Sequence, residues 1–191
     1  MFSASAEFYD LIYSTFKDYV AEVDQINSLL RRLNPQCQTI LDMACGTGEH
    51  AKLLAARGFV VDGLDLEPAF VRIAAQKHPA GQFFAADMSD FHLSGRYDAV
   101  LCLFSSIGYL KTLDRVGGAL TCFREHLAPE GVIVIEPWFP PGALDSARAG
   151  LEQAPRDLTL LHRATAASLW MRDVTAARGL VERLGAHAAR R

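Results

Sequence analysis

The sequence predicts an α/β fold built on a doubly wound, mostly parallel β-sheet. Short apolar runs of strand length alternate along the chain with longer segments of helical periodicity. The strand runs are apolar almost throughout, which is typical of parallel strands covered on both faces. One of these runs passes through a glycine-containing bend at residues 42–48 directly into a helix. Ligands of such sheets bind beyond the carboxyl ends of the strands, so the residues after each strand are the first functional candidates.

The first half of the pattern supplies two strands and the helices beside them. We expect an amphipathic helix over residues 17–33, because apolar side chains recur there at helical spacing. The run Thr39–Leu41 predicts a buried strand, and residues 49–57 predict the helix that follows the bend. Gly58 ends this helix, and Val60–Leu64 is the second expected strand.

The second half repeats the alternation. Pro68 is well placed to begin a helix that runs to Lys77, because proline fits the first helical position. The remaining elements are two strands, a helix, a Pro-Glu-Gly turn and a last strand. They are expected at residues 82–86, 97–104, 113–127, 129–131 and 132–135.

Composition bounds the class of protein. At 191 residues, half of them apolar, the chain can form one domain with a sizeable core. A net charge of -3 with scattered Lys and Arg predicts neither a nucleic-acid partner nor attraction to an anionic membrane. No apolar run approaches the roughly 18 residues of a membrane span, and residues 1–9 lack signal-peptide features, so we expect a cytoplasmic protein. The widely spaced cysteines (Cys37, Cys45, Cys102 and Cys122) predict reduced thiols and no metal site.

The composition changes near residue 144. Residues 145–191 contain no Ile, Phe, Tyr or Lys and are rich in Ala and Arg. We therefore expect a ligand-binding domain over residues 1–144 and a divergent tail, helical or disordered, over 145–191. A shifted reading frame or a truncation would produce this composition. A sheet that lacks its last strands would leave the fifth strand as an uncovered edge, so that the chain would be unstable, dependent on a homodimer, or inactive while retaining part of its ligand site.

The bend is the most informative motif. It runs Asp42-Met43-Ala44-Cys45-Gly46-Thr47-Gly48, and its two glycines let the backbone turn sharply and approach a ligand closely. The segment satisfies the G-x-G-x-x-G/A pattern, and Asp65 lies 19 residues after Gly46, near the position of a ribose-binding acid. This pattern alone is weak, because nicotinamide, flavin and other nucleoside cofactors all use it.

Two further acids narrow the choice of cofactor. Asp42 stands where the strand of a dehydrogenase normally continues with apolar residues, and an acid there suits a cofactor that carries an ammonium group. Asp87 follows the third strand, where a carboxylate can accept a hydrogen bond from an adenine amino group. A dinucleotide would also need a second nucleotide-binding half, for which this chain hardly has room.

At these residues the sequence resembles the class I methyltransferases that use S-adenosylmethionine, whose fold is Rossmann-like. The matching motifs are Asp42–Gly48, Gly63–Leu66 and Ala86–Met88. The aromatic segment at residues 8–19, together with residues 103–110 and 136–140, is similar to nucleotide-linked aminosugar N,N-dimethyltransferases of the desosamine and mycaminose type. The similarity runs from about Ala6 to Pro141.

The resemblance implies S-adenosylmethionine as cofactor and a role for each strand end. The loop backbone would hold the methionyl part with Asp42 organising it, Asp65 would bind the ribose and Asp87 the adenine, and Phe104 would cover the sulfonium. Three tyrosines would form a lid, with Tyr13 nearest the acceptor amine. The full cofactor-binding set is Tyr9, Tyr13, Tyr19, Asp42, Ala44, Gly46, Thr47, Gly48, Asp65, Leu66, Asp87, Met88 and Phe104.

The acceptor side is implied in the same way. An amine must be uncharged to attack a methyl sulfonium, and His126 occupies the position of the family's candidate general base. We therefore expect His126 and Tyr13 to be catalytic, although His126 near a helix end can instead complement the helix dipole. Glu136 is an alternative group to orient the amine. The expected substrate-binding residues are Ser105, Ser106, Glu136 and Trp138.

The predicted function is methyl transfer from S-adenosylmethionine to a small-molecule amine, most plausibly an aminosugar nucleotide. A small-molecule O-methyltransferase is the nearest alternative. A cofactor-binding remnant without turnover is a second alternative, and a nicotinamide dehydrogenase is a distant third.

Overall fold

The computed structural model describes residues 6–15 and 17–136. The chain divides into two units, Met1–Pro137 and Trp138–Arg191, and every described residue belongs to the first. Trp138, the expected tail at residues 145–191 and the domain boundary at residue 144 lie outside the described residues and stay predictions.

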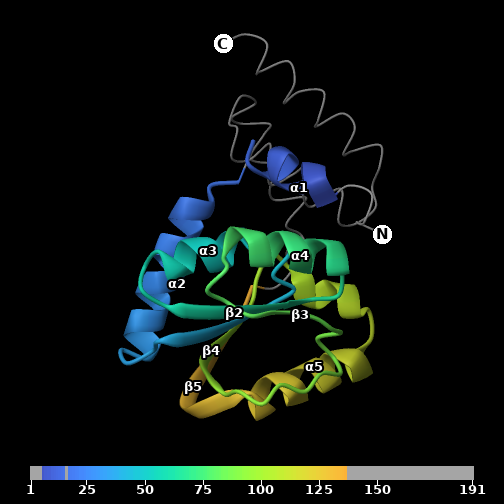
Figure 1. Cartoon of the computed structure of the whole chain (residues 1–191). Coiled ribbons are helices and arrows are strands. Elements are labelled where there is room, and N and C mark those ends of the chain that lie inside the picture. Colours follow the sequence, from blue (N-terminus) through green and yellow to red (C-terminus); the bar gives the residue numbers. More distant parts are fainter. Residues whose placement is uncertain (1–5, 16, 137–191) are drawn as a thin grey trace, which may run out of the picture. The chain divides into compact units, whose positions relative to one another are not determined.

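The described residues contain a five-stranded parallel sheet with the strand order β3-β2-β1-β4-β5 (Figure 1). This confirms the predicted doubly wound α/β fold. The strands are β1 (Thr39–Met43), β2 (Val60–Asp65), β3 (Phe83–Ala85), β4 (Tyr97–Cys102) and β5 (Leu127–Ile135). The chain builds outward from β1 in one direction and then crosses back to β4, so the carboxyl end of β1 lies at the topological switch point.

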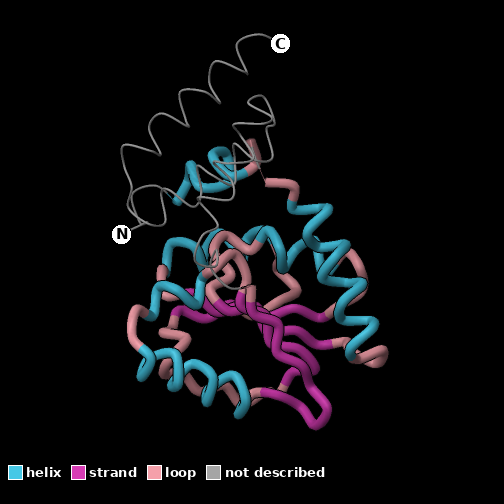
Figure 2. The backbone as a smooth tube through the Cα atoms, turned by 180° about the vertical axis from the view of Figure 1, so that it is seen from behind, coloured by secondary structure: helices cyan, strands magenta, loops and turns pink. Residues whose placement is uncertain are grey.

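Helices cover both faces of this sheet (Figure 2). Within the described part of the chain, α2, α3 and α4 lie on one face and α5 lies on the other (Figure 1). The helices are α1 (Ala6–Tyr13), α2 (Tyr19–Leu33), α3 (Glu49–Ala55), α4 (Pro68–Lys77) and α5 (Leu113–Glu125), with a short 3₁₀ helix η1 (Ser106–Leu110). α2 begins two residues later than expected because the Asp18 carboxylate accepts a hydrogen bond from Ala21 N at 2.9 Å and caps the helix.

All five strands differ from their predicted bounds by one to five residues, and two of these differences have a clear cause in the backbone. β5 begins at Leu127, because the Pro-Glu-Gly turn lies inside the strand as a bulge with Glu130 at φ +61°. β4 ends at Cys102 rather than residue 104, because Phe104 and Ser105 adopt left-handed φ angles of +52° and +58°. The second difference turns the chain away from the sheet at the edge where ligands bind.

The main core lies between the sheet and the α2–α3 face. Its fully buried members include Leu30 of α2, Leu54 of α3 and Ile40 of β1. The half-buried Val132 and Val134 of β5 pack against this core. β5 is the outer strand of the described sheet and pairs only with β4 there. Among the described residues, no helix is long and apolar enough to cross a membrane.

Candidate active site

The bend between β1 and α3 is built from left-handed backbone. Ala44, Gly46 and Gly48 have φ angles of +54°, +56° and +76°. The Gly48 N–H donates to Cys45 O at 3.0 Å and closes the turn. A Cβ built on Gly46 would meet only a ring carbon of Tyr9, at 3.9 Å. The space between the Gly46 backbone and the Tyr9 ring is therefore open.

A pocket lies against this bend. Its lining comes from the N-terminal segment, the ends of β1 and β4, and the start of α3. The residues are Tyr9, Lys17, Tyr19, Asp42, Ala44, Cys45, Gly46, Thr47, Glu49, His50, Leu103, Phe104 and Ser106. Seven of the expected cofactor residues are among them, together with the expected substrate residue Ser106. The other expected residues in the described part do not line it: Tyr13, Gly48, Asp65, Leu66, Asp87, Met88, Ser105, His126 and Glu136.

Asp42 is the chemically distinctive residue of the pocket. Its side chain is 2% exposed, and Oδ2 is the one buried side-chain polar atom of the described residues that has no hydrogen-bond partner. Burial, with a smaller contribution from Asp65, raises its pKa to about 6 even though the nearby His50 and Lys17 act to lower it. A buried carboxylate without a partner is costly unless a cation arrives. This residue therefore fits a ligand that brings an ammonium group.

Asp65 holds the backbone of the bend through a hydrogen bond. Its Oδ2 accepts from Gly46 N at 2.8 Å, and its Oδ1 accepts from Glu67 N at 2.9 Å. Burial raises the pKa of Asp65 despite these two hydrogen bonds. Because each carboxylate oxygen has a second acceptor site, hydroxyl groups of a ligand can still donate to Asp65.

Asp87 lies after β3 at the same edge of the sheet but has its own partners. Its Oδ1 accepts from Ser89 N and Ser89 Oγ at 2.9 and 2.7 Å, and Oδ2 pairs with Arg115 at 2.6 Å. Burial alone would raise the pKa of Asp87, but the hydrogen bonds from Ser89 and Arg115 lower it overall. The three strand-end acids thus share one edge, while only Asp42 lines the pocket.

The tyrosines of the N-terminal segment make two sets of ring contacts beside the bend, one through Tyr9 and Tyr13 and the other through Tyr19. The ring centroids of Tyr9 and Tyr13 are 4.4 Å apart, and the Tyr13 ring meets Phe104 edge-on at 5.3 Å. The Tyr19 ring meets His50 at 5.0 Å. Burial raises the pKa of all three tyrosines. Their hydroxyl groups are therefore protonated at neutral pH, and Tyr13 can orient an amine but cannot act as a phenolate base.

A cluster of four side chains ties α1 to the bend; we call it the Lys77 cluster. Lys77 Nζ lies 2.5 Å from Asp10 Oδ2, 3.1 Å from Glu49 Oε2 and 3.1 Å from Thr47 Oγ1. Thr47 also donates to Asp10. Because Asp10 lies between Tyr9 and Tyr13 on α1, this cluster holds the tyrosines above the pocket.

We expect Lys77→Met to weaken binding of S-adenosylhomocysteine about 5-fold and to speed amide exchange in α1, since one ammonium holds two carboxylates there. Isothermal calorimetry and hydrogen exchange measure the two effects. Lys52→Met is the matched control, because Lys52 pairs with Glu49 from an exposed position within α3. An equal change in both variants would contradict a role of the Lys77 cluster in holding α1.

The ends of β4 and β5 are joined by Glu136. Its Oε2 accepts from Phe104 N at 2.6 Å, and its own N–H donates to Cys102 O at 2.9 Å. Left-handed φ angles at two successive non-glycine residues are strained and persist where surrounding contacts hold them. Glu136 supplies such a contact, and it fixes Phe104 at the mouth of the pocket.

The expectation that His126 acts as general base is wrong. His126 follows α5 at the start of β5, and its carbonyl accepts from Tyr97 N at the first residue of β4. It therefore lies at the amino ends of the strands, opposite the pocket. Both ring nitrogens are used, one facing Cys122 O at 2.7 Å and the other accepting from Leu93 N at 2.8 Å. The buried ring stacks on Phe91 with centroids 4.4 Å apart.

A structural role for His126 makes a clear prediction. His126→Ala should lower the free energy of unfolding by about 2–4 kcal/mol, because a buried ring and two hydrogen bonds are lost. The affinity for S-adenosylhomocysteine should not change. Urea unfolding and calorimetry measure these quantities, and the exposed neighbour His92, changed to Ala, is the control. A loss of affinity without a loss of stability in His126→Ala would instead show that His126 takes part in ligand binding.

Four charged or polar side chains at or beside the pocket were not among the expected site residues: Lys17, Glu49 and His50, which line it, and Glu22 beside them. Lys17 and His50 both contact Glu22 Oε2, at 2.7 and 3.0 Å. Lys17 belongs to the Lys-Asp-Tyr run that carries Tyr19, so its place beside the aromatic residues was the available signal. Glu22 had no signal, because it lies on the polar face of an amphipathic helix.

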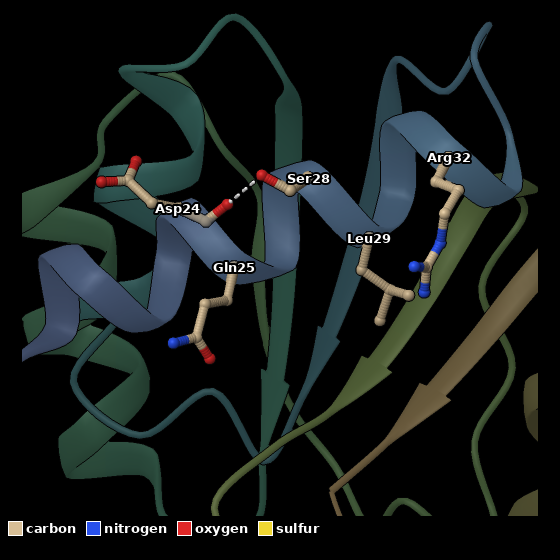
Figure 3. A pocket seen from close by; sticks show the side chains of 5 residues that line it. All are labelled: Asp24, Gln25, Ser28, Leu29 and Arg32. Atoms are coloured by element: carbon tan, nitrogen blue, oxygen red, sulfur yellow. Dashed lines mark hydrogen bonds between the residues drawn. The ribbon is translucent and has the colours of Figure 1, made fainter.

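A second hollow lies on the outer face of α2 and has a volume of about 380 Å³ (Figure 3). All of its lining residues belong to this one helix: Asp24, Gln25, Ser28, Leu29 and Arg32. The Ser28 hydroxyl is already used, since it donates to Asp24 O at 2.8 Å. No strand end or loop contributes to this hollow, so we assign it no function.

Comparison with known proteins is consistent with this geometry. Residues 40–131 match the family model of a methyltransferase domain. The chain is 38% identical over 153 residues to the dTDP-3-amino-3,4,6-trideoxy-alpha-D-glucopyranose N,N-dimethyltransferase of Streptomyces venezuelae, covering 80% of this chain and 65% of that protein. It is 42% identical over 137 residues to the dTDP-3-amino-3,6-dideoxy-alpha-D-glucopyranose N,N-dimethyltransferase of Streptomyces fradiae, covering 71% and 54%.

A solved structure shows the same architecture. The S-adenosylmethionine-bound amino pentose methyltransferase of Micromonospora echinaspora superposes with a TM-score of 0.67 at 36% identity, over 70% of this chain and 57% of that one. The chain thus spans between 54% and 65% of the length of the two Streptomyces relatives. The matched domain includes β1, the bend and the ends of β2 and β4. Residues 40–131 of the chain thus match a methyltransferase domain, and the chain is similar to proteins that are N,N-dimethyltransferases of dTDP-linked aminosugars and to a methyltransferase solved with S-adenosylmethionine bound.

Proposed function

We propose that this chain transfers a methyl group from S-adenosylmethionine to the amino group of a nucleotide-linked aminosugar. The observation that carries the proposal is the buried, unpartnered carboxylate of Asp42 in a pocket beneath the tyrosine-bearing α1. The substrates named for the relatives from Streptomyces support the choice of acceptor. The activity of the chain is a proposal, because the chain spans only part of the length of those relatives.

The cofactor, when bound, supplies a methyl group already activated on a sulfonium. Asp42 would hold its ammonium group, and the backbone of Ala44, Gly46 and Thr47 would enclose the methionyl part. Asp65 would accept from the ribose hydroxyls next to Leu66. Adenine would lie beside Asp87 and Met88, where Asp87 shares its carboxylate with Arg115. Gly48 would act through the turn that it closes.

The acceptor would enter beside Tyr13, Phe104 and Glu136. The amine must arrive uncharged, because an ammonium has no lone pair to form the new bond. The Tyr13 hydroxyl oxygen and the free acceptor sites of the Glu136 carboxylate would orient the amine, and Glu136 can take up the proton that the methylated amine releases. Ser105 and Ser106 lie on the same turn after β4. Trp138 was expected here too and lies outside the described residues.

Two alternatives stay open for this chain. A small-molecule O-methyltransferase would use the same cofactor pocket with a different acceptor. A cofactor-binding remnant without turnover is favoured by the chain's length relative to the matched proteins. The expected homodimer and the cytoplasmic location also remain predictions.

Mass spectrometry of the acceptor tests the proposal. The purified chain is incubated with S-adenosylmethionine and a dTDP-linked 3-amino-sugar, and we expect one or two methyl groups on the amine. A phenol and a hydroxylated sugar nucleotide without the amine are the control acceptors. Methylation of a control acceptor alone would replace the proposal with an O-methyltransferase. Binding of S-adenosylhomocysteine with no product from any acceptor would identify a remnant.

A further inference from the structure

β5 is covered less completely than the strands inside the described sheet. Every residue of β1 after Thr39 is buried, and so is every residue of β4 except Asp98. By contrast, every residue of β5 is half-buried or exposed. Side chains of a strand alternate between the two faces of a sheet, so neither face of this strand is fully covered. The last four residues of β5 are nevertheless all apolar: Val132, Ile133, Val134 and Ile135.

The backbone of this apolar segment points alternately toward β4 and away from the sheet. Glu136 N donates to Cys102 O of β4 at 2.9 Å. Alternate residues of a strand bond to the same neighbouring strand, so the N–H of Val134 also faces β4 in the parallel register. The N–H and C=O groups of Ile133 and Ile135 therefore face outward. Among the described residues, no strand pairs with this outer side of β5.

The outer side of the apolar segment also lacks the features that usually keep edge strands apart. Natural edge strands carry charged residues, prolines or bulges. β5 has such features only near its amino end, where the Pro-Glu-Gly bulge lies. Residues 132–135 contain neither a charge nor a proline. Residues 145–191 contain no Ile, Phe or Tyr, so their composition does not predict a strand that could pair with this edge.

We propose that residues 132–135 pair antiparallel with the same residues of a second copy of this chain, which joins the two sheets across a twofold axis. The edge is self-complementary in this arrangement. When the two copies of Val134 lie opposite each other, Ile133 of one copy faces the partner's Ile135, and each such pair exchanges two hydrogen bonds. No like charges meet at the axis, because the segment is uncharged. The contact is short, so we expect a dissociation constant on the order of micromolar.

Sedimentation velocity and residue-resolved hydrogen exchange test the proposal on the unaltered chain. We expect a monomer that converts to a dimer between about 1 and 300 μM. Over the same range, amide exchange at Ile133 and Ile135 should slow by about 10-fold, whereas exchange at Val134, which is bonded to β4, should change much less. This inference does not depend on the proposed methyl transfer, because neither measurement needs a ligand.

Three outcomes would overturn the proposal. The first is a chain that stays monomeric with fast exchange at Ile133, which would mean that the edge is uncovered. The second is a monomer with slow exchange at Ile133, which would mean that another segment of the same chain covers the edge. The third is a dimer whose formation does not change exchange at Ile133 and Ile135, which would place the contact on another surface.

Two proline variants form a matched pair. Ile133→Pro removes an outward N–H, at a position where edge strands tolerate proline, and should leave a folded monomer over the whole concentration range. Val134→Pro removes an N–H that faces β4 and should lose stability instead. If Ile133→Pro does not fold, Ile133→Lys places a charge on the edge without altering the backbone and should weaken the dimer about 10-fold or more. A dimer as tight as wild type in either folded Ile133 variant would overturn the proposal.

Discussion

Asp42→Asn should weaken binding of S-adenosylhomocysteine roughly 100-fold and, at the same time, make the ligand-free chain more stable at neutral pH. The two effects have one cause. The Asp42 carboxylate is buried without a hydrogen-bond partner for Oδ2, so its charge is costly until a cationic group binds. Asparagine removes the charge, and with it both the cost in the free chain and the attraction for the ammonium.

The pKa of Asp42 gives this prediction a pH dependence with a definite sign. Burial raises the pKa from 3.8 to about 6, so the folded chain binds more protons than the unfolded chain between these values. The free energy of unfolding therefore falls as pH rises from about 4 to about 6, by about 3 kcal/mol for this group. Affinity for an ammonium-bearing ligand changes the other way and rises through about pH 6, because only the ionised carboxylate attracts the cation.

Urea unfolding between pH 4 and 8 and calorimetry over the same range measure these changes in wild type and Asp42→Asn. Asp98→Asn is the matched control. The Asp98 carboxylate accepts from Gln38 N, Thr39 N and Thr39 Oγ1 at 2.9 Å each, at the amino ends of the strands. We expect this control to lose stability without losing affinity. A loss of stability in Asp42→Asn would show that the carboxylate has a partner in the free chain.

Gly48→Ala should lower the free energy of unfolding by about 3 kcal/mol or more, the second large effect that we expect. Gly48 has a φ of +76°, which a residue with a Cβ adopts only with strain. A Cβ at this position would also lie 2.8 Å from Cβ and 2.9 Å from Cα of Ala74 in α4. The Ala74 backbone cannot move aside as a flexible side chain can. To accommodate the new Cβ, α3 and α4 must therefore move apart.

Gly58→Ala separates the cost of backbone strain at a left-handed φ from the cost of the steric clash with Ala74. Gly58 has a similar left-handed φ of +91°, but a Cβ there would meet no atom within 4 Å. Gly58→Ala should lower the free energy of unfolding by about 1–2 kcal/mol, because only backbone strain contributes there. Thermal or urea unfolding of both variants gives the comparison. Equal losses of stability at the two positions would mean that the close packing of Gly48 on Ala74 contributes nothing.

The local pattern of residues was sufficient to predict the sheet and the position of the bend. Alternating apolar strands and amphipathic helices leave few topologies other than a parallel sheet, because short crossovers are right-handed and strands buried on both faces need helices around them. Parallel strands place their carboxyl ends at one edge. Asp42, Asp65 and Asp87 were therefore expected together before any coordinate was known, and they do share that edge.

Whether an acid at that edge is free to bind a ligand was decided by partners far away in the sequence. Asp87 is paired with Arg115 of α5, and Asp65 with the N–H of Gly46, whereas Asp42 lacks a partner for Oδ2. For His126, the residue type suggested a catalytic role that its position in the fold does not support. Its residue type suits a general base, but the strand that follows it places it at the far edge of the sheet.

The sequence by itself predicted the fold class, the glycine bend and the class of cofactor, because these depend on short-range periodicity and on the resemblance of three strand-end motifs to the class I methyltransferases. Only the tertiary structure brought Lys17 to the pocket beside Asp42 and joined Asp10 to Lys77. Hydrogen bonds and ion pairs act over a few ångströms in space, and residues 67 positions apart along this chain meet at that distance only after it has folded.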